Sequence, residues 1–265
     1  MRKTFAIIAL ATIFSFAAGA QSSQDQYPLA NISQNPGLCS IFHSWGFIGD
    51  SLCSGEHEYH TAEGKKAYVD LYEYSWGMRM CALMGVKGDV YAKGGETAKG
   101  WIDHFWDKAK EDPKQAYIMA LCINDAGRGF KPGDVKTDVD TSDFTKNAET
   151  FAGYYAGIIQ RIQSIQPDAK IFVVTRPRQG AVREDFNNVI RSMATTFKNV
   201  YVIDLYKYAP YYDEEFKEMY FLGGHMNAAG YEYTAWMMMN YIDWIIRHNP
   251  QDFKEAAFIG TPYKA

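Results

Sequence analysis

Short apolar runs alternate with longer amphipathic stretches along most of the chain. Five short runs are typical of buried strands, at residues 45–48, 89–92, 116–123, 171–175 and 200–205. Stretches with helical periodicity separate them, at residues 68–84, 98–110, 148–165, 183–197 and 228–247. Strands that alternate with helices indicate βαβ crossovers. The pattern therefore predicts an α/β fold, with a five-stranded parallel sheet covered by helices on both faces.

The two ends of the chain differ from this alternating region. Residues 1–20 carry two basic residues, then a short apolar stretch, then small residues, a pattern typical of a signal peptide. Residues 21–37 are polar and indicate a tether, residues 38–250 form one folded domain, and residues 251–265 form a C-terminal tail. We expect an exported protein, periplasmic or secreted, with no membrane span after signal cleavage.

Composition narrows the class of protein. The chain has 265 residues, of which 47% are hydrophobic and 22% charged, as in an ordinary globular protein. The formal net charge is −4, so there is no basic excess to bind a nucleic-acid backbone. No glycine-rich phosphate-binding pattern follows the first predicted strand, which disfavours a nucleotide-binding domain. Aromatic residues are frequent, at 15%.

The cysteines and histidines give no metal pattern. Four cysteines in an exported chain allow three full disulfide pairings, and buried free thiols are an equal alternative. His57 and His60 could share one helical face, but no third ligand accompanies them, so we interpret them as surface or substrate-contacting residues. We expect no metal and no organic cofactor, and the oligomeric state stays open. The cysteines are Cys39, Cys53, Cys81 and Cys122.

Polar residues with chemical potential follow the predicted strands directly. Ligands of such sheets bind beyond the carboxyl ends of the strands. Gly49-Asp50-Ser51 follows the first strand, Gly94-Gly95 the second and Asn124-Asp125 the third, and His225 precedes the last helix. A serine on a tight strand-to-helix turn is a candidate nucleophile, and a nearby histidine can remove its proton.

The same segments contain candidate donors for an oxyanion hole. The backbone N–H groups of Ser51 and Gly95 and the side-chain amide of Asn124 could stabilise the negative charge of an oxyanion. Asp125, which follows Asn124, is expected to tie loops together rather than to react.

These segments resemble the four sequence blocks of the SGNH hydrolases, also called GDSL esterases. In this chain the blocks read Gly49-Asp50-Ser51-Leu52, Gly94-Gly95-Glu96-Thr97, Cys122-Ile123-Asn124-Asp125 and Leu222-Gly223-Gly224-His225. The resemblance extends over residues 42–247. It implies a flavodoxin-like three-layer α/β/α sandwich, with Ser51 and His225 as catalytic residues and Ser51, Gly95 and Asn124 as the oxyanion hole.

Two positions depart from the family pattern. Cys122 replaces a glycine, and Leu222 replaces the aspartate that normally orients the histidine ring. A backbone carbonyl could hold the ring of His225 instead, which would leave a Ser-His dyad. Another carboxylate could substitute, for which Asp204 and Glu218 are the candidates. Catalysis could also be lost.

The resemblance, the predicted export and the aromatic content favour a serine esterase that hydrolyses small acyl esters, chiefly acetyl esters of carbohydrates. A non-catalytic carbohydrate-binding protein on the same fold is the alternative, because of Leu222. Asp50, Arg176 and Tyr220 are candidate substrate contacts, although Asp50 is expected mainly to tie loops together. The aromatic run that contains Tyr220 could form a rim for sugar rings or pack into the core.

Overall fold

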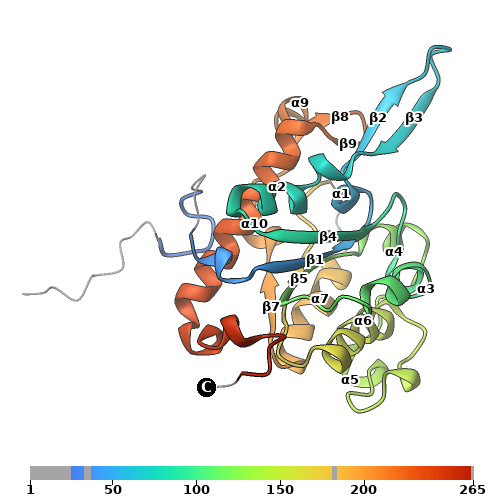
Figure 1. The fold of residues 1–265 in the computed structure, drawn as a ribbon. Helices are drawn as coiled ribbons and strands as arrows, with labels where there is room; N and C mark the ends of the chain where they lie inside the picture. Colours follow the sequence, from blue (N-terminus) through green and yellow to red (C-terminus); the bar gives the residue numbers. More distant parts are fainter. Residues whose placement is uncertain (1–24, 33–36, 181–183, 264–265) are drawn as a thin grey trace, which may run out of the picture.

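A five-stranded parallel sheet forms the centre of the molecule (Figure 1). The computed structural model describes residues 25–32, 37–180 and 184–263. The strand order is β4-β1-β5-β6-β7, which is the 2-1-3-4-5 order of flavodoxin-like sheets. All five predicted strands are confirmed; they are β1 (Ser44–Gly49), β4 (Lys87–Ala92), β5 (Ala116–Ala120), β6 (Lys170–Val174) and β7 (Val200–Ile203).

Helices cover both faces of the sheet, as predicted for a three-layer sandwich (Figure 1). Trp45 and Phe47 of β1 are buried on one face, and Ile48 is buried on the other, because successive side chains of a strand point to opposite faces. The first face is covered by α2 (Trp76–Met84) and α10 (Ala228–His248), and the second by α3 (Ala98–Ala109), α6 (Phe151–Ile165) and α7 (Glu184–Thr196).

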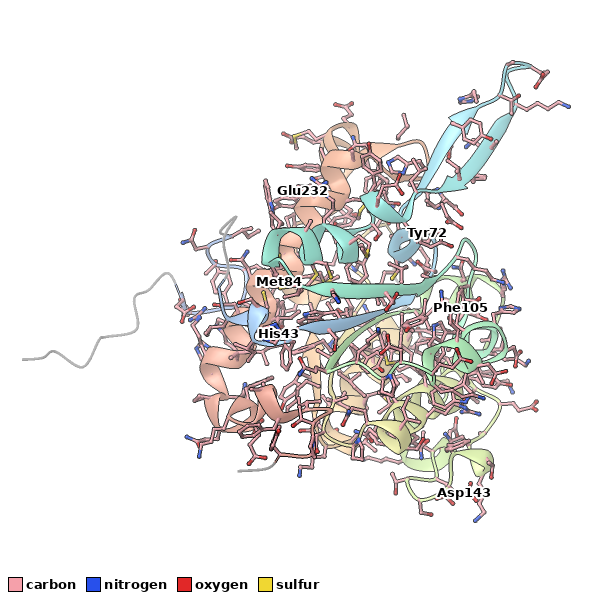
Figure 2. All side chains as sticks on the ribbon, viewed as in Figure 1. His43, Tyr72, Met84, Phe105, Asp143 and Glu232 are labelled. Carbon is pink, nitrogen blue, oxygen red and sulfur yellow. The ribbon has the colours of Figure 1, made fainter. Side chains whose placement is uncertain are left out.

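The predicted helix over residues 68–84 begins only at Trp76. Its first part belongs to a β-hairpin that projects from the body, made of β2 (Glu56–His60) and β3 (Lys66–Asp70) (Figures 1 and 2). Tyr72 lies at the base of this hairpin (Figure 2). The pairing of β3 with β2, rather than its own apolar period, decides its conformation.

This hairpin also corrects the helical interpretation of His57 and His60. Both residues lie on β2, where positions three apart point to opposite faces of the strand. They therefore share no face on which a metal could bind.

Short elements connect the layers. The long connection at residues 126–146 is not structureless: it contains the end of α4, all of α5 and a 3₁₀ turn at Phe144–Lys146. The short helices and strands are α1 (Ser51–Ser54), α4 (Ile123–Gly127), α5 (Val135–Asp138), α8 (Leu205–Tyr208), α9 (Glu214–Tyr220), β8 (Phe221–Leu222) and β9 (His225–Met226).

The segments predicted as tether and tail are packed where the structure describes them. Leu29 of the tether is buried in the core beside α10, and Tyr27 stacks on Tyr208. Phe253 and Ile259 of the tail are buried in the same core. The predicted signal peptide, residues 1–20, lies outside the described residues.

Two further findings concern the sequence expectations. All four cysteines are buried and none of them is joined in a disulfide, so the structure forms none of the possible pairings. Among the described helices, none combines the length and apolar character that a bilayer crossing requires.

Candidate active site

The carboxyl ends of three neighbouring strands lie at one level. Gly49, the last residue of β1, pairs with Ala92 of β4 on one side and Ala120 of β5 on the other. The segments that follow these strands carry Ser51, Gly95 and Asn124 respectively. They leave the sheet next to the point where the strand order reverses, which is the ligand-binding edge of such folds.

Ser51 is the first residue of α1, directly after β1. The carboxylate of Asp50 caps this helix, accepting a hydrogen bond from the Leu52 N–H at 3.1 Å. Only glycine fits at position 49, since a Cβ there would lie 2.3 Å from the Cβ of Cys53. The Ser51 side chain is 9% exposed, and neither its hydroxyl nor its backbone N–H makes a hydrogen bond within the described residues.

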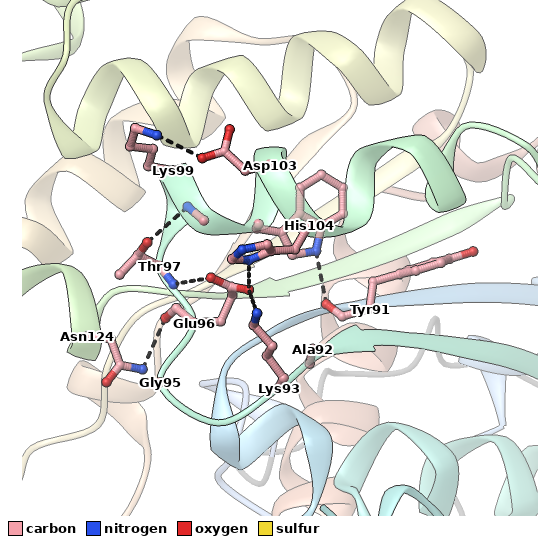
Figure 3. Close-up of polar contacts among 12 residues, drawn as sticks. Tyr91, Ala92, Lys93, Gly95, Glu96, Thr97, Lys99, Asp103, His104 and Asn124 are labelled. Carbon is pink, nitrogen blue, oxygen red and sulfur yellow. Dashed lines mark hydrogen bonds and ion pairs between the residues drawn. The ribbon is translucent and has the colours of Figure 1, made fainter.

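Gly95 lies in the loop between β4 and α3 (Figure 3). Its backbone has a φ of 72°, which favours glycine, and its carbonyl accepts a hydrogen bond from Arg128 Nη2 at 2.6 Å. The next residue, Glu96, is buried and accepts a hydrogen bond from the Thr97 N–H at 3.0 Å. The loop is thus fixed on both sides, whereas the Gly95 N–H makes no hydrogen bond in the part of the chain that the structure describes.

Asn124 connects these two loops. Its Nδ2 donates to the Glu96 carbonyl at 3.0 Å (Figure 3) and to Asp50 Oδ2 at a longer 3.4 Å. The side-chain amide therefore lies between the residue before Ser51 and the residue after Gly95. Asp125 ties loops as expected, since its Oδ1 accepts from the Ala98 N–H at 3.0 Å. The structure thus gathers the three predicted oxyanion donors at one edge of the sheet.

His225 approaches the same edge from the C-terminal part of the chain. It lies on β9, which contacts α1, the helix that Ser51 begins. Its ring Nε2 is 2.9 Å from Oε1 of Glu56, whereas its Nδ1 is buried and has no hydrogen-bond partner among the described residues. No hydrogen bond joins the Ser51 hydroxyl to the ring, so the two segments meet but the expected contact is not formed within the described residues.

The structure corrects both proposed replacements for the missing aspartate. Asp204 faces Arg191 and Thr175 instead of His225, at 2.8 Å and 2.9 Å. Burial raises the pKa of Asp204. The hydrogen bonds from Arg191 and Thr175 lower this pKa by more than burial raises it, so the net shift is downward. Glu218 is exposed on α9 and forms no hydrogen bond or ion pair in the described chain.

Two glutamates of the hairpin lie against the site, and sequence reasoning missed both. Besides Glu56, Glu58 accepts a hydrogen bond from the Gly224 N–H at 2.9 Å and pairs with Lys66 at 2.8 Å. Gly223 allows this approach, because a Cβ there would lie 2.2 Å from Glu58 Oε1. The hairpin therefore holds the loop that precedes His225. The only local signal was the position of the acids just after the serine turn.

The other candidate contacts differ in their surroundings. The ring of Tyr220 packs between Phe216 and Tyr233, at 4.7 Å and 5.0 Å between centroids, so it belongs to a packed aromatic cluster. Arg176 has its backbone held by Asn187, while its side-chain Nε is buried and has no hydrogen-bond partner in residues 25–32, 37–180 and 184–263.

Arg176 also lines a largely apolar cavity of about 90 Å³. Immediate neighbours of Ser51, Asn124 and His225 line the same cavity, among them Leu52, Ile123 and Met226. The cavity therefore lies beside the gathered motif residues. No group of three or more possible metal ligands occurs among the described residues.

Replacing Asp50 with asparagine is expected to flatten the pH dependence of stability. Burial raises the pKa of Asp50 from 3.8 to about 7. The stability contributed by its protonation is fully present below about pH 4 and is lost as the pH rises through about 7. We expect the Tm of Asp50→Asn to fall less than that of the wild type between pH 4 and 8. Equal slopes in both proteins would contradict the raised pKa.

Comparisons with known proteins give one family match and several similar folds. The model of the GDSL-like lipase/acylhydrolase family matches residues 47–233. No curated protein matches the sequence significantly. Among solved structures, a possible lipase from Chitinophaga pinensis is 18% identical, with a TM-score of 0.55; the match covers 78% of this chain and 98% of that one.

Two further structures have similar folds. The psychrotrophic esterase EstA from Pseudoalteromonas is 14% identical, with a TM-score of 0.54 and coverage of 77% of this chain and 99% of that one. A family two carbohydrate esterase from Clostridium thermocellum is 16% identical, with a TM-score of 0.51 and coverage of 79% and 64%. At these identities the likeness shows a shared fold.

Proposed function

The chain belongs to the GDSL-like lipase/acylhydrolase family, and on this premise we propose that it is an exported serine esterase that removes small acyl groups, chiefly acetyl, from carbohydrates. The observation that carries the proposal is the bridging position of Asn124. Its amide donates toward both Asp50 and Glu96, next to the N–H groups of Ser51 and Gly95, which make no hydrogen bond within the described ranges. The signal-like pattern of residues 1–20 supports export.

In the proposed reaction, Ser51 Oγ attacks the ester carbonyl carbon and its proton passes to His225. The carbonyl oxygen becomes an oxyanion, which the N–H groups of Ser51 and Gly95 and the Asn124 amide stabilise. The C–O bond to the alcohol then breaks, and the alcohol takes the proton from His225. Water repeats the sequence on the acyl-serine and releases the acid. The hydroxyl and ring must approach for this, as catalytic contacts often do only when substrate binds.

We assign the acyl group to the cavity beside the motif residues. Its lining is mainly apolar, which suits a short hydrocarbon chain, and its volume of about 90 Å³ is small. Arg176 also lines it and could contact a polar substituent of the acyl group.

The carbohydrate part of the proposal rests on Tyr68. Its ring lies edge-on to the ring of His225, with 5.3 Å between centroids, and the residue is 49% exposed. An exposed aromatic face next to the catalytic ring suits the stacking of a sugar on the alcohol side of the ester. One of the similar structures is a carbohydrate esterase, which agrees with this substrate class.

Replacing Tyr68 with alanine is expected to raise KM for an acetylated oligosaccharide about 3- to 10-fold, because aromatic contacts contribute about 0.5–1.5 kcal/mol. KM for p-nitrophenyl acetate should change less than about twofold, since this substrate has no sugar. Tyr59→Ala is the matched control, because Tyr59 is similarly exposed but points to the other face of the hairpin. Equal effects of the two substitutions would contradict the role of Tyr68.

The esterase itself is tested with p-nitrophenyl acetate and a p-nitrophenyl phosphonate. We expect steady turnover of the acetate, and inactivation by the phosphonate with release of one equivalent of p-nitrophenol. Peptide mass spectrometry should find the phosphonyl group on Ser51. Binding of acetylated oligosaccharides without turnover and without an adduct would favour the non-catalytic alternative instead.

A further inference from the structure

The carboxylate of Glu56 lies against the ring of His225, where the family pattern provides no acid. Glu56 Oε1 is 2.9 Å from Nε2 of the ring, and the two side chains are only 13% and 18% exposed. Glu56 belongs to the hairpin and follows Ser51 closely in the chain, whereas the usual aspartate would stand at position 222.

We propose that Glu56 is the positioning residue that replaces this aspartate, and that it acts on the opposite ring nitrogen. The Nε2–H of His225 donates to Glu56, and Nδ1 is left to accept the proton of Ser51. This inference rests on the proposed esterase function and specifies how its histidine works.

The backbone around Glu56 is firmly fixed. The hydroxyl of the buried Tyr231 donates to the Glu56 carbonyl at 2.6 Å. Gly55, the preceding residue, has a φ of 74°, and a Cβ there would lie 2.4 Å from the Leu71 carbonyl oxygen. Glu56 is therefore connected rigidly to α1, the helix that Ser51 begins.

The carboxylate itself is confined as well. A Cβ on Gly94 would lie 2.0 Å from Glu56 Oε2, so the absence of a side chain at position 94 makes room for the acid. One oxygen thus packs against the loop that precedes Gly95, and the other faces His225. This placement connects the acid to both the oxyanion loop and the general base.

The tautomer of the His225 ring determines which nitrogen donates a hydrogen bond and which accepts one. A neutral imidazole carries one N–H and one lone pair. A carboxylate at 2.9 Å from Nε2 favours the N–H on that nitrogen, so the lone pair falls on Nδ1. Nδ1 is buried and has no hydrogen-bond partner in the part of the chain that the structure describes, as expected for an acceptor that still lacks its donor. The free hydroxyl of Ser51 is the donor we assign to it.

Position 222 offers no competing acid. Leu222 pairs with His225 across the short β8–β9 ladder, and it is 52% exposed. Its side chain can neither accept a hydrogen bond nor stabilise the protonated ring. The substitution that weakened the family motif is therefore compatible with an acid supplied from the hairpin.

The groups around Glu56 and His225 shift the pKa of the His225 ring in both directions. Burial lowers the pKa of His225, and His57 and Lys66 lower it further, while Glu58 and Asp70 raise it. Burial and Asp70 raise the pKa of Glu56. Other groups close to the pair are Asp50, which caps α1, and Tyr231 of α10. Because Glu56 Oε1 lies 2.9 Å from Nε2 of the ring, loss of the Glu56 charge should be visible in the titration of His225.

The first test is the kinetics of Glu56→Gln, which keeps the shape of the side chain and removes its charge. We expect kcat for p-nitrophenyl acetate to fall about 30- to 100-fold, with KM changed less than about threefold. The acid limb of the pH profile of kcat/KM should move to lower pH by roughly one unit, because the protonated ring loses its counter-charge. Glu56→Asp should keep the position of this limb.

Glu63→Gln is the matched control, since Glu63 lies at the exposed end of the same hairpin and its side chain accepts a hydrogen bond from Thr61 of that hairpin. It should leave kcat and the pH profile unchanged. A Glu56→Gln protein whose kcat is within threefold of the wild type, or higher, would overturn the inference. An unshifted acid limb would do the same, because a purely structural role does not move it.

The second test reads the tautomer of the ring directly. In protein with ¹⁵N-labelled histidine, the resonances that His225→Gln removes belong to His225. We expect the Nε2–H tautomer at a pH above the pKa of the ring. The Nδ1–H tautomer would overturn the proposal that Nε2–H donates to Glu56 and Nδ1 accepts from Ser51. Failure of the esterase proposal would appear separately, as a wild-type protein without turnover or phosphonate adduct.

Discussion

Replacing Ser51 with alanine is expected to lower kcat for p-nitrophenyl acetate by about 10³- to 10⁶-fold, as removal of a serine nucleophile does in other hydrolases. The substitution should hardly change stability, because the Ser51 hydroxyl makes no hydrogen bond within the described chain. We expect the free energy of unfolding to change by less than about 0.5 kcal/mol. Initial rates and urea unfolding of the two proteins check both statements.

The large loss of rate at unchanged stability identifies a reacting group. Ser164→Ala is the control, since the hydroxyl of this exposed serine of α6 donates to the Arg161 carbonyl in its own helix. It should retain full activity. A Ser51→Ala protein that hydrolyses p-nitrophenyl acetate within tenfold of the wild-type rate would remove Ser51 from the mechanism, and turnover would then need another nucleophile.

Replacing Asn124 with alanine is expected to lower kcat by about 10²- to 10³-fold, the usual effect of removing one oxyanion donor. One of its N–H groups is engaged by the Glu96 carbonyl at 3.0 Å. The other makes a long contact of 3.4 Å with Asp50, so it is the one available to a developing oxyanion. KM should change little, because the charge appears only as the reaction proceeds. Steady-state kinetics on p-nitrophenyl acetate provide the measurement.

Asn124→Asp separates the donor from the shape of the side chain. Aspartate has nearly the same outline but no N–H group when ionised, and its charge would repel an oxyanion. Its rate should therefore be at least as low as that of Asn124→Ala. A nearly active Asn124→Asp protein would show that the amide holds loops together without contacting the substrate.

The five strands could be predicted because their signals are local. Buried parallel strands are continuous apolar runs, as in Ile118 and Met119 of β5, and helices with a polar face separate them. The hairpin gave no such signal. Its strands project from the body and carry polar residues on both faces, so only their pairing with each other defines them. Leu29 and Ile259 were missed for a related reason, since single apolar residues in polar segments show no period.

The candidate site likewise has a part that the sequence predicts and a part that depends on contacts between distant segments. The four motif segments follow strands or precede a helix, so the order of elements brings them to one edge of the sheet. The contact of Glu56 with His225 depends instead on how the hairpin leaves α1 and how β9 packs against it. Asp204 looked suitable because it follows β7 directly, but Arg191 on α7 pairs with it, and this partner is visible only in three dimensions.

The burial of the cysteines has a practical consequence. Cys39, Cys53 and Cys81 lie in the core between the sheet and the helices α2 and α10, and burial raises the pKa of each thiol. Water-soluble alkylating reagents can reach these thiols only when the core between the sheet and the helices α2 and α10 opens. The rate at which each cysteine of the native protein becomes alkylated therefore reports how often the core around it opens, without any added probe.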